Sequence, residues 1–383
     1  MRSVVITSFV RTPIGRAQKG SLRDVRPDDL VAGAIAAAVT ASGIDPGLLD
    51  DHVLGTGYPE GRQGANLARR AGLLAGLGDR LPGSTVTRFC ASSLQATRIA
   101  SHAIRAGEAQ AYLVSGVESV SQVGRTTRED DKHPDLMSTP ASSARIADVY
   151  VPMGETAENV AAAYGVTRED MDAFAAESHR RAIAASAFHA RQILPVTTPH
   201  GTVSADDGPR PDTSVERLAT LSPVFREGGS VTAGNSCPLN DGAVAAVLAD
   251  EELAERWGLP VRGRILATSV TALDPAMMGV GPIEAVRSVL ARTGLGIEDI
   301  DLVELNEAFA SQVLAVARTL HIDIDEQLNP FGGALALGHP FGMTGLRLVG
   351  ALVDGLQERN GRYGLATLCV GGGQGMALLL ERV

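Results

Sequence analysis

A cysteine at the start of a helix is the first residue of this sequence whose setting suggests chemistry. Cys90 follows a β-prone run at 85–89 and precedes a helix-like run at 92–105, which Gly107 closes. A thiol beside the unpaired N–H groups of a helix's first turn meets a positive potential. That potential favours the thiolate and lowers its pKa below the ~8.5 of a free cysteine. The two serines that follow are expected to accept hydrogen bonds from the first-turn amides. The pattern predicts a buried nucleophile; the alternative is a small core residue at the end of a strand.

Three further clusters of small and polar residues follow predicted strands. Because the carboxyl ends of parallel strands meet at one edge of an open sheet, we expect these clusters to lie near Cys90. They are the Asn-Glu-Ala-Phe-Ala run at 306–310, the Gly- and Ala-rich run at 332–340, and the Cys-Val-Gly-Gly-Gly-Gln-Gly run at 369–375.

His339 is the best candidate base among the eight histidines. The proline that follows it fixes the backbone, whereas the other seven fall on predicted helices or polar loops. A neutral imidazole here can take the thiol proton of Cys90 or donate to a developing oxyanion. The alternative is a histidine that caps a turn.

Cys369 precedes a turn with four glycines in six residues. Glycines let backbone amides crowd a ligand, and amides aimed at one point form an oxyanion hole. A second thiol there can pass a proton to carbon, or it is a buried strand cysteine. Asn306 can hold a water or donate an amide N–H, or it caps a helix expected over 307–320. Glu307 is expected to be a first-turn charge and not a catalytic acid.

Composition limits the class of protein. With 383 residues, the chain exceeds the ~250–300 at which single cores divide, and a net charge of -10 argues against nucleic acid and anionic membranes as partners. Three scattered cysteines form no disulfide framework and no metal-ligand spacing. No apolar run approaches the ~20 residues of a membrane span, and no signal peptide is recognised. We therefore expect a cytoplasmic protein without a bound metal.

Apolar strands alternate with helices in the first and last parts of the chain, which predicts an α/β class with a largely parallel sheet. The order of helix, glycine, Asp-containing turn and strand at 42–55 recurs at 293–306, and 90–94 then falls on 342–346. We interpret this as a duplicated α/β unit. The expected boundaries are an amino-terminal half at 1–118, completed by about 236–256, a loop domain at 119–235, and a carboxyl-terminal half at 257–383.

Taken in order, the clusters resemble the thiolase family along nearly the whole chain. The resemblance implies two α/β halves in a five-layer αβαβα arrangement, plus a loop domain that receives coenzyme A, in a homodimer or homotetramer. It rests on the three clusters above and on the runs at 10–16, 90–95, 153–159, 232–235 and 240–243.

The resemblance also implies residue roles. Cys90 is then the nucleophile that carries the acyl group, and His339 activates it. With a water held by Asn306, His339 also stabilises the enolate oxygen of acetyl-CoA. Cys369 is the second acid/base, and the backbone N–H groups of Cys90 and Gly371 form another oxyanion hole. Coenzyme A is a substrate and not a permanent cofactor. The CoA and acyl channel is implied for Met153, Arg210, Phe225, Ala233, Cys237 and Ala308.

Departures from common family patterns bear on the substrate. Pro152 stands where many short-chain, biosynthetic members have histidine, Cys237 where many have serine, and Ser93 where glycine is frequent. These choices are more similar to degradative thiolases, in particular bacterial enzymes that shorten steroid side chains. The leading hypothesis is thiolytic cleavage of a 3-oxoacyl-CoA. The alternatives are acetoacetyl-CoA synthesis, a ketosynthase, which lacks a use for Cys369, and a non-catalytic CoA- or lipid-binding protein.

Overall fold

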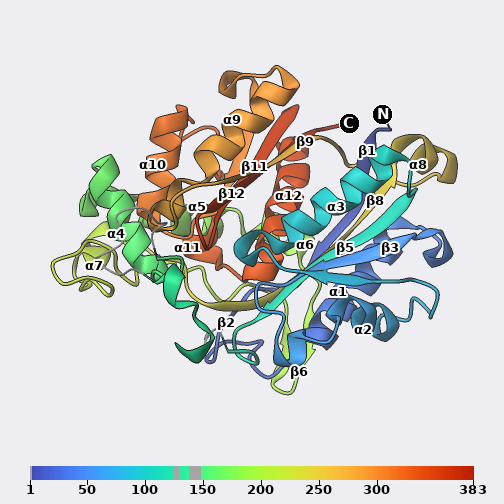
Figure 1. Cartoon of the computed structure of the whole chain (residues 1–383), viewed down its shortest axis with the longest axis horizontal. Helices are drawn as coiled ribbons and strands as arrows, with labels where there is room; N and C mark the ends of the chain where they lie inside the picture. Colours follow the sequence, from blue (N-terminus) through green and yellow to red (C-terminus); the bar gives the residue numbers. More distant parts are fainter. Residues whose placement is uncertain (1, 125–128, 138–147) are drawn as a thin grey trace.

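Two equivalent groups of strands form the framework of the protein (Figure 1). In the computed structural model, which describes residues 2–124, 129–137 and 148–383, they join in one mixed sheet with the order β10-β11-β12-β9-β1-β8-β5-β3-β4. The strands are β1 (Val4–Arg11), β3 (Asp51–Gly55), β4 (Ser84–Val86), β5 (Ala111–Ser119), β8 (Asn240–Asp250), β9 (Gly263–Ala272), β10 (Leu302–Leu305), β11 (Tyr363–Val370) and β12 (Gln374–Glu381). A two-residue strand, β2 (Gly15–Arg16), pairs with β8.

The strand order confirms the duplication predicted from the sequence, but the prediction of a largely parallel sheet is wrong. β8 and β12 each run antiparallel to both of their neighbours in the strand order. Strands covered by helices on both faces are apolar throughout whatever their direction, so this signal did not fix the strand directions. In the amino-terminal group, β1 pairs antiparallel with β8, β8 antiparallel with β5, and β5 parallel with β3. In the carboxyl-terminal group, β9, β12, β11 and β10 repeat this order with the same orientations. The groups join where Val4–Ile6 of β1 lies antiparallel to Gly263–Ile265 of β9.

The repeated run found in the sequence is also repeated in detail. Gly43 and Gly294 each end a helix in the left-handed conformation, with φ of 74° and 70°. A short 3₁₀ turn follows each glycine, and β3 or β10 follows each turn. A helix stopped by glycine and a strand after an acidic turn are local signals, so each half carries them independently of the other.

Helices separate and cover the two strand groups in five layers. The middle layer holds α3 (Ser92–Ala106) and α12 (Phe341–Glu358). The outer layers hold α1 (Pro27–Ser42) with α2 (Leu67–Leu74), and α9 (Pro282–Thr293) with α10 (Ala310–Leu320); Figure 1 shows these pairs on opposite sides. Successive strand side chains point to opposite faces. On β1, Val4 and Ile6 therefore join the middle core, and Val5 joins the outer core of α1 and α2.

The middle layer is where the two halves meet most closely. The two halves touch there through residues 90–94 and 342–346, which are equivalent segments of the internal repeat. The Ser93 hydroxyl donates to the Met343 carbonyl at 3.1 Å and accepts from the Leu346 amide at 2.9 Å. A β-carbon on Gly345 would lie 2.6 Å from Leu94 Cβ, so glycine is what allows the two helices to approach.

The serines therefore do not cap α3 as expected. Neither the Ser92 nor the Ser93 side chain makes a helix-cap hydrogen bond. Ser92 instead accepts from the Arg88 amide at 2.9 Å and donates to the Phe89 carbonyl at 2.7 Å, which tightens the turn before the helix. Ser93 binds across to α12, because the buried carbonyl and amide there also need partners.

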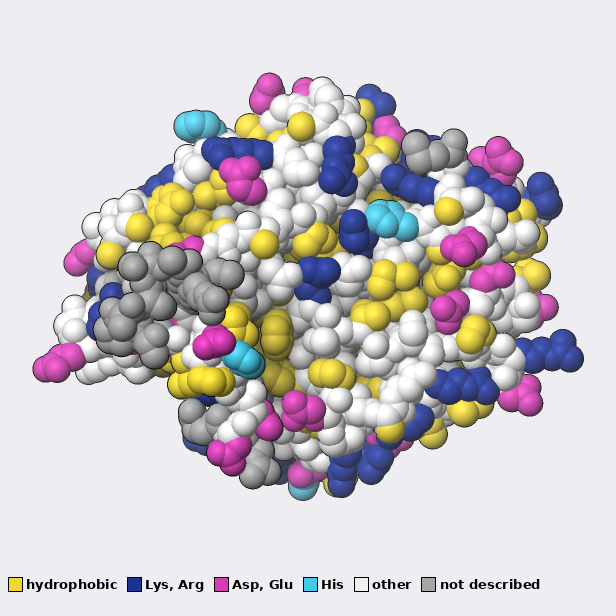
Figure 2. Space-filling view, in the orientation of Figure 1, with side chains coloured by type: hydrophobic (Ala, Val, Ile, Leu, Met, Phe, Trp, Pro, Cys, Tyr) yellow, Lys and Arg dark blue, Asp and Glu magenta, His cyan; other side chains and the backbone are white. Residues whose placement is uncertain are grey.

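The segment between the halves carries α4 (Met153–Tyr164), α5 (Arg168–Ala184), α6 (Ser186–Gln192), α7 (Val215–Ala219) and the hairpin of β6 (Val196–Thr198) and β7 (Gly201–Val203). α4 and α5 pack on α10, and α5 also packs on α11 (Ala334–Leu337). Within the described residues, no helix is both long and apolar enough to cross a membrane. Basic and acidic side chains are interspersed over the face drawn in Figure 2.

Two glycine substitutions test the close approach of α3 and α12. Alanine in place of glycine inside a helix ordinarily stabilises by ~1 kcal/mol. At Gly345 the new β-carbon collides with Leu94, and overpacking of this kind costs about 1–3 kcal/mol. At Gly33 in α1 the nearest atom is Leu194 Cδ2 at 3.8 Å. We expect Gly345→Ala to lower the free energy of unfolding in urea and Gly33→Ala to keep or raise it. Equal effects of the two variants would contradict this packing.

Candidate active site

Cys90 lies in a tight turn immediately before α3. The strand expected over 85–89 ends at Val86, and a 3₁₀ turn spans Phe89–Ala91. Phe89 has a φ of 42°, in the left-handed region that a β-carbon disfavours, and the Ser92 hydroxyl holds both peptides around it. The Cys90 side chain is half-buried. The strained turn thus holds the Cys90 thiol, partly buried, beside the N-terminus of α3.

Hydrogen bonds fix the orientation and tautomer of His339. Its amide donates to Asn240 Oδ1 at 2.9 Å, and its Nδ1 lies 2.7 Å from Thr344 Oγ1. The Thr344 hydroxyl donates its one proton to the Pro340 carbonyl, at 2.8 Å. Nδ1 must therefore carry the ring proton and donate it to Thr344. Nε2 is left with a lone pair that can accept a proton.

Asn306 faces that lone pair. Its Nδ2 lies 3.3 Å from His339 Nε2, and its buried Oδ1 has no partner in the described structure. Helix α10 begins at Ala310 with Phe309 as its N-cap, so the helix-cap interpretation of Asn306 is wrong. An amide with a bound histidine and a free oxygen can position a water beside the ring.

Burial keeps the imidazole neutral. Removal from solvent, and then the positive charge of Arg347, lower the pKa of His339 to about 3. The ring is therefore uncharged at neutral pH, and Nε2 keeps its lone pair.

Glu307 has a structural role and is not a first-turn charge. It lies before α10 and is buried, where it accepts from Ser178 Oγ at 2.6 Å, Asn329 Nδ2 at 2.8 Å and the Leu335 amide at 3.1 Å. Burial raises the pKa of its carboxyl group. These bonds tie α5 and α11 to the end of β10, next to Asn306.

Cys369 is buried at the end of β11, close to the other two thiols. Burial raises its pKa well above the ordinary value, and the charges of Cys90 and Cys237 raise it further. It packs in an apolar cluster with Met153 and Ala308. A thiol that stays protonated next to a nucleophile can donate a proton to carbon.

The glycine-rich turn after Cys369 lies against the turn of Cys90. A β-carbon on Gly371 would lie 3.6 Å from Phe89 Cδ2 and 3.9 Å from Met153 Sδ. The Gly371 backbone of the carboxyl-terminal half therefore lies beside the Phe89 side chain, which directly precedes Cys90.

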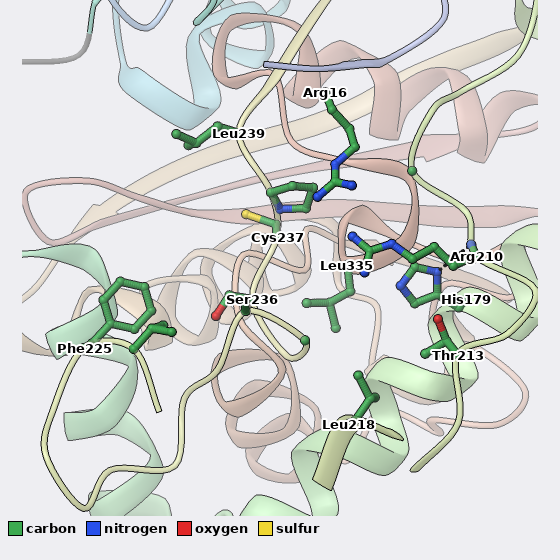
Figure 3. Close-up of a pocket in the computed structure, with 15 residues that line it drawn as sticks. Arg16, His179, Arg210, Thr213, Leu218, Phe225, Ser236, Cys237, Leu239 and Leu335 are labelled. Atoms are coloured by element: carbon green, nitrogen blue, oxygen red, sulfur yellow. Dashed lines mark hydrogen bonds between the residues drawn. The ribbon is translucent and has the colours of Figure 1, made fainter. Parts of the chain in front are cut away.

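A cavity of about 290 Å³ adjoins this cluster through Cys237, which lines its wall (Figure 3). Four of the six residues expected in the CoA channel line it, namely Arg210, Phe225, Ala233 and Cys237. The other two, Met153 and Ala308, lie deeper with Cys369, and the Cys237 amide donates to the Ala308 carbonyl at 3.0 Å. Four of the six residues thus lie on the cavity wall, and the other two pack with Cys237 and Cys369 next to it.

Arg16 also lines the cavity and was not singled out from the sequence. Figure 3 shows its guanidinium next to that of Arg210, and burial and then the charge of Arg16 lower the pKa of Arg210. Two neighbouring cations suit an anionic ligand. In the residues that the structure covers, no group of three histidine, cysteine or acidic side chains is placed to hold a metal ion.

Comparison with known families agrees with this geometry. The thiolase N-terminal domain model matches residues 4–252, and the thiolase C-terminal domain model matches residues 259–382. The chain belongs to the thiolase family. Members of this family are acyltransferases, so the protein is an enzyme.

Several characterised thiolases are similar over their full length. The chain is 42% identical over 400 residues to the 3-ketoacyl-CoA thiolase of Bacillus subtilis and 44% identical over 406 residues to the beta-ketoadipyl-CoA thiolase of Pseudomonas aeruginosa, with 100% of each chain covered. Among solved structures, human mitochondrial 3-ketoacyl-CoA thiolase in complex with CoA superposes with a TM-score of 0.91 at 35% identity, covering 100% of this chain and 98% of that one. The acetyl-CoA acetyltransferase of Bacillus anthracis gives 0.91 at 38%, covering 100% and 99%.

The buried imidazole predicts a specific proton titration. With a pKa of about 3 in the folded state, His339 stays neutral from pH 9 to about pH 5. Unfolding releases the ring to its ordinary pKa near 6.5 and takes up a proton below that pH. This histidine therefore makes the fold less stable as the pH falls from 6.5 toward 3. NMR of ring-labelled protein, with the signal assigned from His339→Asn, should show no titration above pH 5. A midpoint near 6.5 would contradict the burial argument.

Proposed function

We propose that the protein is an acetyl-CoA C-acyltransferase that cleaves a 3-oxoacyl-CoA with coenzyme A, through an acyl group on Cys90. The observation that carries this proposal is the closeness of three thiols, those of Cys90, Cys237 and Cys369, beside a neutral histidine and its asparagine partner at a neighbouring strand end. One of the three, Cys237, also lines the cavity. One thiol, a base and amide donors would serve ordinary acyl transfer. A second, protonated thiol is the feature that carbon–carbon cleavage requires.

In the first half-reaction, His339 Nε2 takes the Cys90 proton and the sulfur attacks the ketone carbon. The bond between that carbon and the neighbouring CH₂ breaks, which leaves an acyl thioester on Cys90 and the enolate of acetyl-CoA. The enolate oxygen is stabilised by His339 and a water on Asn306. Cys369 then protonates the enolate carbon and becomes a thiolate.

In the second half-reaction, the Cys369 thiolate takes the proton of an incoming CoA thiol. The CoA sulfur attacks the acyl group, and the backbone N–H groups of Cys90 and Gly371 hold the oxyanion. Loss of one such donor typically costs ~100–1,000-fold in rate. The Cys90 sulfur leaves and recovers its proton from His339. The products are acetyl-CoA and an acyl-CoA shortened by two carbons.

The relatives support thiolysis without fixing the acyl group. Their names mention both 3-ketoacyl-CoA and beta-ketoadipyl-CoA, so the steroid side chain expected from Pro152, Cys237 and Ser93 stays a prediction. Acetoacetyl-CoA synthesis is the second candidate, favoured by the likeness to an acetyl-CoA acetyltransferase. The homodimer or homotetramer and the cytoplasmic location also stay predictions.

Mass spectrometry of the intact protein tests the covalent step. After incubation with acetyl-CoA, the wild type should carry one acetyl group, mapped by digestion to Cys90. Cys90→Ala should carry none. If the wild type remains unmodified, thiolysis through Cys90 is excluded.

A second variant separates the roles of the two thiols. Cys369→Ala should still acquire the acetyl group on Cys90, because the nucleophile and its base remain. Its thiolysis of acetoacetyl-CoA should fall by at least about 1,000-fold, because general acid–base steps of this kind contribute ~100–10,000-fold. Unimpaired cleavage and condensation in Cys369→Ala would favour a ketosynthase instead. Wild-type kcat/KM for acetoacetyl-CoA, 3-oxoadipyl-CoA and long-chain 3-oxoacyl-CoA then ranks the substrates.

A further inference from the structure

Arg88, two residues before the nucleophile, connects the two halves of the protein. Its Nε donates to Gln95 Oε1 in α3 at 3.0 Å, and its Nη1 donates to Gln374 Oε1 at the start of β12 at 2.5 Å. The first contact lies within the amino-terminal half, and the second spans 286 positions of sequence. A planar guanidinium holds two such acceptors in a fixed geometry.

Arg88 is held by uncharged partners. Its side chain is half-buried, and both of its acceptors are uncharged amide oxygens. Among the described residues it forms no salt bridge. Burial, and then the like charge of Arg98, lower its pKa. Burying a cation without a counter-charge is costly, so its hydrogen bonds must have a use that offsets the cost.

Gln374 carries the connection on to Gly371. Its Nε2 donates to the Gly371 carbonyl at 3.4 Å, across the glycine turn in which Gly372 and Gly373 have positive φ. Three glycines in a row leave this turn few side-chain contacts of its own. The position of Gly371 relative to Phe89 therefore depends on bonds from outside the turn.

We propose that Arg88 and Gln374 are positioning residues that set the spacing between the two backbone donors of the oxyanion hole, the N–H groups of Cys90 and Gly371. This inference rests on the proposed function, because that function assigns the two donors. We call the hydrogen bond between Arg88 and Gln374 the bridge. Its Arg88 end fixes the turn of Cys90, where Phe89 is strained. The other end holds the Gly371 carbonyl, in the peptide that directly follows the Gly371 N–H. Neither side chain touches the reacting atoms in this account.

The bridge explains why two turns from different halves can form one anion site. Each turn alone has a conformation that its own residues only partly determine, and donors of an oxyanion hole act only within a narrow range of distance. Loosening the bridge should cost transition-state stabilisation and leave substrate binding, which depends on the cavity residues, largely unchanged.

Steady-state thiolysis of acetoacetyl-CoA by four variants tests the proposal. Arg88→Met and Gln374→Leu each break the bridge and should lower kcat by about 10- to 100-fold, less than the ~100–1,000-fold cost of deleting a donor. KM for CoA should change by less than about twofold. The double variant should lose no more than either single variant, because the two residues act as one unit. Arg88→Lys keeps the positive charge but not the planar guanidinium that reaches both acceptors, and its kcat should be as low as that of Arg88→Met.

Controls separate the bridge from a loss of folding or of nucleophile. Arg69→Met removes a similarly half-buried arginine in α2 that binds the Leu81 and Asp79 carbonyls, and it should keep wild-type kcat. The rate of Cys90 alkylation by iodoacetamide should be the same in all variants. Wild-type kcat in Arg88→Met, or recovery of kcat in Arg88→Lys, would overturn the proposal. If instead the proposed thiolytic function is wrong, the wild type itself will not cleave acetoacetyl-CoA.

Discussion

The contact between α3 and α12 is the constraint on which the rest of the structure depends. Gly345 lets the helices touch at Leu94, and the Ser93 hydroxyl binds a carbonyl and an amide of α12. Cys90 comes immediately before α3 and His339 immediately before α12, so the same contact fixes where both begin. Two residues 249 positions apart in the sequence are thereby held at the same helix–helix contact.

Burial then sets the protonation states that the chemistry needs. An exposed histidine and an exposed thiol exchange protons with water near pH 6.5 and 8.5. Here the same groups are buried, which lowers the pKa of His339 and raises that of Cys369. The base is therefore neutral and the acid is protonated over one shared range of pH. The fold reaches this state through desolvation, with charged neighbours such as Arg347 as a secondary cause.

Local signals in the sequence predict the duplicated α/β unit but not the strand directions. Glycine stops, acidic turns and apolar strands each act within a few residues, so the repeat of α1 to β3 in α9 to β10 could be predicted. The antiparallel pairing of β8 and β12 depends on distant strands and could not. Cys90, His339 and Cys369 are candidates because they follow strand ends or border glycine turns, and their roles are implied by resemblance to a family.

Other features depend on distant contacts and could not be predicted. The sequence predicts that Ser93 caps a helix, but its hydroxyl binds the Met343 carbonyl and the Leu346 amide of α12 in the other half of the molecule. Glu118 carries no local signal, but its buried carboxylate accepts from the Gly57 amide at 2.7 Å and the Gly342 amide at 2.9 Å, joining both halves beside the site. Arg16 and Arg88 look like ordinary surface arginines in the sequence. Their neighbours in space come from segments about 190 and 290 residues away.

A crystal structure of the enzyme soaked with acetyl-CoA would show whether these groups share one reaction centre. We expect electron density for an acetyl group on Cys90, with its carbonyl oxygen within hydrogen-bonding distance of the Cys90 and Gly371 amides. The Cys369 sulfur and His339 Nε2 should both be in van der Waals contact with the acetyl group or with the water on Asn306. An acetyl group on Cys90 that neither Cys369 nor His339 can reach would contradict the account.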